Sequence, residues 1–159
     1  MIKLASCIFF CSGLTFDLLT GVNNRNAMNN DVDQFVWSKT LGIVFADLNG
    51  LQRVNDKEGH DAGDLLLKNA ALALQRIFVG SKIYRSGGDE FLVIAPDITE
   101  DDLNQRVKAL HKVSESPDSP SFAIGSVFSN KETDIRKMMQ TADELMYQNK
   151  AQYYDQHKI

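Results

Sequence analysis

Hydrophobic positions along this chain form short blocks that are typical of strands. Residues 41–46 are a continuous apolar run that ends at Asp47, as in a strand covered on both faces. Two β-favouring runs, residues 83–85 and 92–95, flank a Gly-Gly pair. They predict a hairpin, because glycine accepts the positive φ of tight turns. Residues 121–128 alternate apolar and polar positions and predict a last strand.

Other segments carry apolar side chains at helical spacing. Thr99 is expected to cap one of these helices, since three acids follow it and favour the helix dipole. Asp61 is a good N-cap for another. The helices are expected over residues 20–37, 51–57, 65–78, 99–113 and 135–153.

The order of these elements predicts the fold class. Helices separate most strands, so strands that pair in the sheet are mostly not neighbours in the chain. We expect an α+β sandwich of the ferredoxin-like kind, with a central, mostly antiparallel sheet flanked by helices. The first strand and the hairpin then lie side by side, and Asp47 is expected to face Asp89 across a strand boundary.

Composition narrows the function. The 159 residues suit one domain, and a net charge of -4 argues against a general nucleic-acid binder. A phosphate ligand would therefore need a local cation or a metal. Cys7 and Cys11 are expected to be reduced thiols in the cytoplasm. Residues 4–10 are apolar but too short to cross a bilayer, so no membrane contact by the domain is expected.

Asp47 and Asp89 suggest metal chemistry. Two carboxylates held together raise each other's pKa, and a divalent cation relieves the repulsion. Mg²⁺ prefers oxygen ligands and is usually bound by one or two carboxylates together with substrate phosphates. Two such ions about 3.5 to 4 Å apart stabilise the attacking and leaving oxygens of a phosphoryl transfer. The pair of acids therefore suggests nucleotidyl transfer.

Asn55 and Asp64 flank the break at Gly59 and suit recognition of a purine. A carboxylate accepts from the N1–H and amine of guanine, whereas adenine presents an acceptor at N1. The alternative is structural: Asp64 follows the expected cap Asp61 and would favour the same helix dipole.

Taken together, the motifs resemble the GGDEF family of diguanylate cyclases, in family order from Asp17 to about Lys150. The motifs are Asp17-Leu18-Leu19-Thr20-Gly21-Val22-Asn23-Asn24-Arg25, Asp47-Leu48-Asn49-Gly50, Val54-Asn55-Asp56, Gly59-His60 with Gly63-Asp64, Arg85-Ser86-Gly87-Gly88-Asp89-Glu90-Phe91, and Ala142-Asp143 with Tyr147 and Lys150.

The resemblance implies a palm-like fold and condensation of two GTP into cyclic di-GMP and pyrophosphate, a bacterial second-messenger reaction. It implies two Mg²⁺ ions per site, with Mn²⁺ able to substitute. Asp47 and Asp89 would be metal ligands together with the Leu48 carbonyl, and Glu90 would be an accessory acid. Asp89 would also help to deprotonate the attacking 3'-hydroxyl.

The resemblance also assigns substrate contacts. Asn55 and Asp64 would bind guanine, and His60 would line the nucleotide site. Lys150 would face the terminal phosphates, with a cation favoured near a helix C-terminus as the alternative. Arg85 is grouped with them, although it would either pair with an acid to support the hairpin or lie on its exposed face.

The family mechanism brings two active sites together, so a homodimer is expected, along with a possible upstream sensory domain. No nucleic-acid polymer is expected as a partner. We expect a catalytic domain over residues 17–155, after a linker or helix remnant at residues 1–16 and before a tail at residues 156–159.

Three departures from the family pattern qualify the expected activity. Leu51 and Gln52 stand where an aromatic residue and lysine are common, and Tyr153-Tyr154-Asp155 replaces Gly-Arg-Asn. Arg53 is a candidate substitute for one missing cation. The inhibitory Arg-x-x-Asp motif is replaced at Phe78 and Ser81, which predicts no feedback inhibition there. The alternative function is a degenerate module that binds GTP and regulates a partner without turnover.

Overall fold

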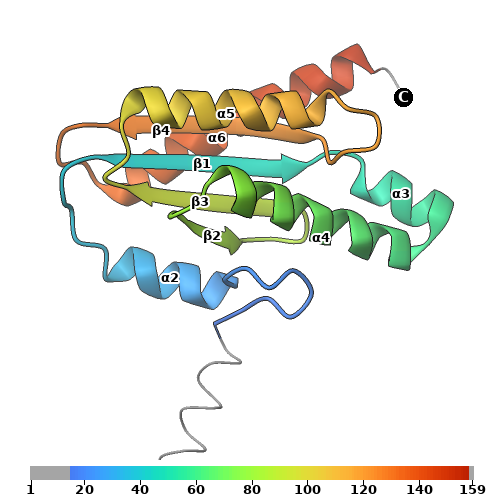
Figure 1. Cartoon of the computed structure of the whole chain (residues 1–159), viewed down its shortest axis with the longest axis horizontal. Helices are drawn as coiled ribbons and strands as arrows, with labels where there is room; N and C mark the ends of the chain where they lie inside the picture. Colours follow the sequence, from blue (N-terminus) through green and yellow to red (C-terminus); the bar gives the residue numbers. More distant parts are fainter. Residues whose placement is uncertain (1–14, 158–159) are drawn as a thin grey trace, which may run out of the picture.

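The computed structural model describes residues 15–157 and confirms the expected α+β fold (Figure 1). Four antiparallel strands form one sheet in the order β2-β3-β1-β4. Helices cover both of its faces. The elements are α2 (Arg25–Asp33), β1 (Leu41–Leu48), α3 (Leu51–Glu58), α4 (His60–Ile77), β2 (Lys82–Arg85), β3 (Glu90–Pro96), α5 (Glu100–Ser114), β4 (Phe122–Ser129) and α6 (Ile135–Gln156).

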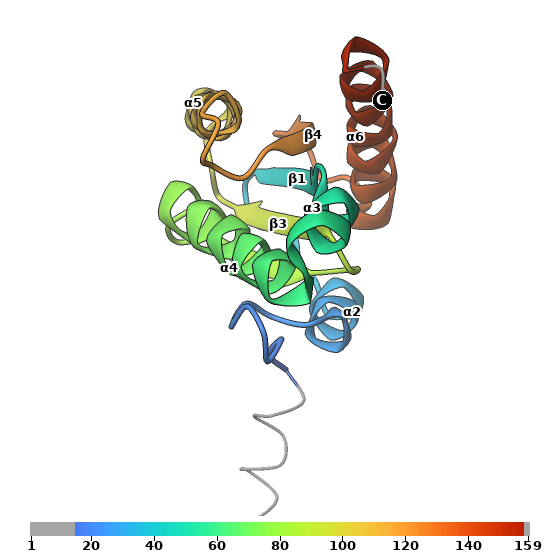
Figure 2. The ribbon, with the colours of Figure 1, turned by 90° about the vertical axis from the view of Figure 1, so that its right-hand side faces the viewer.

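Strand β1 is the centre of the core. All eight of its residues are buried, as expected for a strand between two neighbours and two helical layers. Side chains alternate along it, so Val44 and Ala46 face the layer of α4 and α5, whereas Ile43 and Phe45 face α2 and α6 (Figure 2). Asp47 continues the second series and therefore emerges on the side of α6.

Gly125 lets α6 lie against the sheet. A Cβ atom built on Gly125 in β4 would stand 2.0 Å from the Ala142 carbonyl oxygen and 2.3 Å from the Met146 amide nitrogen. Both are main-chain atoms of α6, so no rotation of a side chain would relieve the contact. The position of α6, and of every functional group that it carries, depends on this glycine.

The first helix is shorter than expected. It covers Arg25–Asp33 instead of residues 20–37, because the Asn24 side chain caps it by accepting from the Ala27 amide. Residues 17–22 form a turn in which the Gly21 amide donates to the Asp17 carbonyl, with Gly21 at a φ of +76°. Local polar contacts therefore override the apolar spacing in this segment.

The expected cap of α4 is also wrong. Gly59, at a φ of +91°, is the N-cap, and the helix begins at His60, which places Asp61 inside the first turn. Asp64 then lies beyond the first turn. The capping alternative for Asp64 therefore loses its basis.

The hairpin is confirmed, but the expected reason for its glycines is not. Neither Gly87 nor Gly88 has a positive φ. Gly87 instead leaves room for a neighbour, since a Cβ atom there would lie 2.8 Å from the Glu90 Oε2 atom. Gly88 offers its carbonyl oxygen to Arg85.

Cys7, Cys11 and the apolar run at residues 4–10 lie outside the described residues. Within residues 15–157, no helix is both long and apolar enough to cross a membrane.

We predict that Gly125→Ala lowers the free energy of unfolding by about 3 kcal/mol, at the high end of overpacking effects, because it opposes main-chain atoms. Urea denaturation measures the change. Gly42→Ala in β1 is the control. Its added methyl group meets only side-chain carbons of Ile98 and Leu103, at 3.0 to 3.1 Å, and should cost about 1 kcal/mol. Equal losses would contradict this account of α6.

Candidate active site

Asp47 faces Glu90, and not Asp89 as the sequence suggested. The β1–β3 register pairs Asp47 with Glu90, and the Leu48 amide donates to the Asp89 carbonyl oxygen at 2.8 Å. Asp89 therefore lies one position before β3, on the loop of the hairpin. Because Asp47 and Glu90 are directly paired, their side chains leave the sheet on the same face.

The acids at this strand end crowd one another. Burial raises the pKa of Asp47, which is only 4% exposed, and the charges of Asp89 and Asp143 add to that rise. The pKa of Glu90 is raised by burial and by Asp47, Asp143 and Asp89. Asp143 lies on α6 and belongs to the Ala142-Asp143 motif, to which the sequence assigned no chemical role.

Lys150 is a cation that partly neutralises these crowded acids. Its Nζ donates to both carboxylate oxygens of Asp47, at 2.9 and 3.0 Å. Burial opposes the charged ammonium, but the hydrogen bonds and charge of Asp47 outweigh it, so the pKa of Lys150 is raised. Lys150 lies within α6, six residues before its end at Gln156, so the helix-terminus alternative is not needed.

The donor set fits a hard divalent cation. Carboxylate oxygens are present, and the Leu48 side chain is buried in the core, which leaves its main-chain carbonyl as the group that could bind a metal. Within residues 15–157, no three His, Cys, Asp or Glu side chains gather closely enough to form a metal site alone. A cation here would therefore share its ligands with water or a phosphate ligand.

A cavity of about 580 Å³ adjoins the acids. It brings Asp89 and Lys150 together with the first turn of α3, whose N-cap Gly50 makes no side-chain cap and leaves the first amides free. Its volume is in the range of small-molecule sites. The lining residues are Gly50, Leu51, Gln52, Arg53, Asp56, Lys57, Asp89, Lys150, Tyr153 and Tyr154.

The expected guanine contacts lie on α3 and α4, outside this lining. The Asn55 side chain packs against Gly63, where a Cβ atom would clash with the Asn55 amide. Asn55 is thereby fixed beside the residue that precedes Asp64. Asp64 and His60 are exposed, and the chain reversal at Gly59 brings this region of α4 back along α3 (Figure 1).

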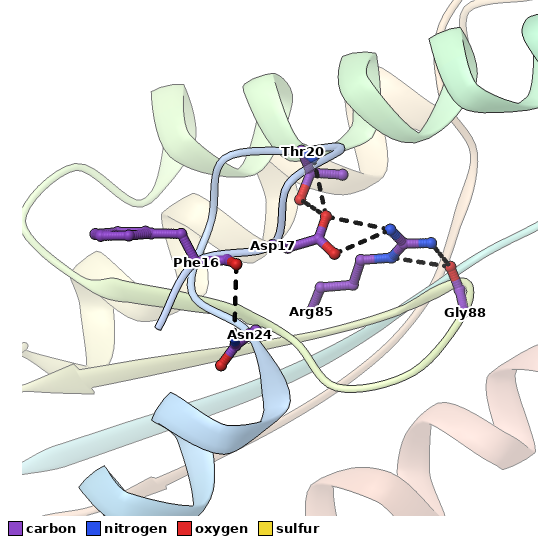
Figure 3. Close-up of polar contacts among 6 residues, drawn as sticks. All are labelled: Phe16, Asp17, Thr20, Asn24, Arg85 and Gly88. Carbon is purple, nitrogen blue, oxygen red and sulfur yellow. Dashed lines mark hydrogen bonds and ion pairs between the residues drawn. The ribbon is translucent and has the colours of Figure 1, made fainter. Parts of the chain in front are cut away.

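Arg85 holds the hairpin (Figure 3) and is not among the residues that line the cavity. Its Nη1 atom contacts both Asp17 oxygens at 3.2 and 3.1 Å, and its Nε and Nη2 atoms donate to the Gly88 carbonyl at 3.1 and 2.8 Å. Burial would raise the pKa of Asp17, but hydrogen bonds from Thr20 and Arg85 lower it. Of the alternatives for Arg85, pairing with an acid is the one observed.

Phe78 is a core residue, 1% exposed at the end of α4. At the first position of the inhibitory motif, where the family pattern has arginine, this chain therefore has an apolar side chain that packs inside the protein.

A family model described as diguanylate cyclase, GGDEF domain, matches residues 14–156. The chain belongs to the GGDEF family.

Similar curated proteins are longer than this GGDEF chain. It is 32% identical over 151 residues to the cyclic di-GMP phosphodiesterase NbdA of Pseudomonas aeruginosa, covering 86% of this chain and 19% of the relative. The diguanylate cyclase DgcN of Escherichia coli is 30% identical, with coverages of 86% and 37%. The response regulator PleD of Caulobacter vibrioides is 33% identical, with coverages of 85% and 34%. The chain thus spans at most 37% of these three relatives.

Solved GGDEF structures share the fold. The coiled coil and GGDEF domain of DgcB from Caulobacter crescentus, in complex with cyclic di-GMP, superposes with a TM-score of 0.80 at 19% identity, covering 94% of this chain and 87% of that one. The FimX GGDEF domain from Pseudomonas aeruginosa gives 0.73 at 20% identity, with coverages of 85% and 93%. These likenesses establish the architecture of this GGDEF domain.

We predict that Glu90→Gln raises the free energy of unfolding at pH 7 by roughly 0.5 to 1 kcal/mol. The folded state raises the pKa of Glu90, so ionisation there opposes folding, and the wild type regains stability as pH falls through that raised pKa. The gain of the variant should therefore fade in acid. Denaturation curves at several pH values measure it, with the exposed Glu132→Gln as control. A gain that does not vary with pH would contradict the crowding of acids.

We predict that Arg85→Lys loosens the hairpin, because one ammonium cannot reproduce contacts to both Asp17 and Gly88. A loss of about 1 kcal/mol should speed hydrogen exchange roughly fivefold at the amides of Ser86 and Gly87, which donate to the Glu90 carbonyl. Arg76→Lys, in the last turn of α4, is the control. Unchanged exchange in Arg85→Lys would show that the guanidinium does not hold the loop.

Proposed function

We propose that this GGDEF domain is a diguanylate cyclase that condenses two GTP into cyclic di-GMP with release of pyrophosphate. The observation that supports the proposal most directly is the meeting of crowded acids and Lys150 beside a cavity large enough for a nucleotide. The proposal includes a cytoplasmic location, where GTP is available, and a role in second-messenger signalling.

The reaction consists of two phosphoryl transfers. In each, a ribose 3'-oxygen forms a bond to the α-phosphorus of the other GTP, the bond to pyrophosphate breaks, and the hydroxyl proton leaves. Asp89 lines the cavity and is our candidate acceptor for that proton. Lys150 places positive charge at the same edge, where the phosphates gain negative charge.

Asp47, Asp89, Glu90 and the Leu48 carbonyl are the groups that would hold Mg²⁺, two ions per site, or Mn²⁺ in their place. Bound Mg²⁺ supplies neutralisation of phosphate charge and a lower pKa for the attacking hydroxyl. The crowding of the acids is consistent with this role, since carboxylates with a raised pKa are stabilised by an added cation.

Guanine specificity is assigned to Asn55 and Asp64, with His60 at the edge of the nucleotide site. The contact of Asn55 with Gly63 supports a shared location for the amide and the Asp64 carboxylate at the start of α4. A base that accepts at N1, such as adenine, would face the acceptor oxygens of Asp64.

The product is two-fold symmetric, so turnover is proposed to need two copies of this domain with their sites opposed. A separate input domain is a possible partner.

A second candidate is a GTP-binding module that regulates a partner without turnover. Gln52 and Tyr154 favour it, because both line the cavity with uncharged side chains at positions where the family pattern described above has cations.

We predict that the chain, incubated with GTP and Mg²⁺, forms cyclic di-GMP, detected by chromatography and mass spectrometry. The rate per chain should rise with protein concentration, and ATP should give less product than GTP. Asp89→Asn should lower the rate about 100-fold or more, because it removes a proton acceptor and a charge. Asp118→Asn, in the exposed loop before β4, is the matched control. GTP binding without product at high protein concentration would instead favour the regulatory module.

A further inference from the structure

Two cations on α3 face the cavity without a partner. Arg53 and Lys57 are exposed, line the cavity with Asp89, and are four residues apart, which places them on one face of the helix. Among the side chains of residues 15–157, neither finds an ion pair or a hydrogen bond. Their positive charge is therefore available to a ligand.

The third cation of the cavity is already engaged. Lys150 donates to both oxygens of Asp47, so its charge is largely balanced within the protein. The acids in the lining are Asp56 and Asp89. If Asp89 serves the metal, as proposed above, α3 supplies two positive charges to the cavity, from Arg53 and Lys57, against one negative charge, from Asp56.

We propose that Arg53 and Lys57 bind the terminal phosphates of the nucleotide and thereby set a preference for triphosphate over monophosphate. This inference rests on the proposed nucleotide function of the cavity. Arginine presents a planar fork that matches phosphate oxygens, and lysine supplies a compact charge one helical turn away. The pair explains how the site can bind phosphates although Gln52 and Tyr154 are uncharged.

The main alternative is that Arg53 and Lys57 are ordinary water-solvated side chains on an exposed helix face and contact no ligand. The two explanations differ in their dependence on the ligand. If the two cations contact the β- and γ-phosphates, removing them weakens the binding of GTP and leaves the affinity for GMP almost unchanged. If the two cations are only solvated, removing them changes the affinity for neither nucleotide.

The test is equilibrium binding of GTP and GMP, with Mg²⁺ present, to the wild type, Arg53→Gln, Lys57→Gln and the double variant. Each single change should weaken GTP binding about tenfold and the double change more, whereas GMP binding should stay within about twofold. The salt dependence of GTP binding should also be shallower in the double variant. Inorganic pyrophosphate should compete with GTP in the wild type and compete poorly in the double variant.

Lys68→Gln is the matched control, because Lys68 is an exposed cation on α4 that does not line the cavity. Both tested side chains are exposed, so the variants should keep the wild-type melting curve by circular dichroism. An unchanged ratio of GTP to GMP affinity in the double variant would overturn the inference, and so would a wild type that binds no GTP.

Product formation is scored separately. If GTP binding depends on Arg53 and Lys57 but no cyclic di-GMP forms, the cyclase proposal fails and the phosphate assignment stands. If cyclic di-GMP forms with an unchanged KM for GTP in the double variant, the cyclase proposal stands and the assignment fails.

Discussion

The burial of Asp47 among other acids is the constraint on which the site depends. Asp47 is the penultimate residue of a strand that is buried along its whole length, so its carboxylate has little water to stabilise it. Pairing with β3 adds Glu90 on the same face, and α6 adds Asp143. A fold that collects negative charge in this way must supply a positive counterpart, and Lys150 is the one observed.

That counterpart is positioned by packing at a distance from the charges. Lys150 reaches Asp47 because α6 lies directly on β4, and the helix lies there because Gly125 has no side chain. The hairpin is held in a comparable way, by Arg85 bridging Asp17 and the Gly88 carbonyl. In both cases, a residue that takes no part in the proposed reaction positions a charged group: Gly125 positions Lys150, and Arg85 positions the hairpin that carries Asp89.

Most of the helices and strands could be predicted from the sequence, because the periodicity of apolar residues indicates which segments form each. The register of strand pairing could not be predicted, since an apolar run locates a strand only to within a residue. A shift of one position places Glu90, and not Asp89, opposite Asp47. Asp143 was part of a quoted motif but received no chemical role, because its effect on Asp47 and Glu90 comes from tertiary contact alone. The start of the first helix was missed because side-chain hydrogen bonds, and not hydrophobicity, determine it.

The contact between Lys150 and Asp47 also bears on how the site would be loaded. Both carboxylate oxygens are already engaged by an ammonium group. If Asp47 holds Mg²⁺, as proposed, the ion would compete with the Lys150 ammonium for the same carboxylate oxygens, and the displaced ammonium would lie beside the cavity that Lys150 lines. The Asp47 carboxylate would thus pass from a singly charged ammonium to a divalent ion, and at no stage would it be buried without a cation beside it.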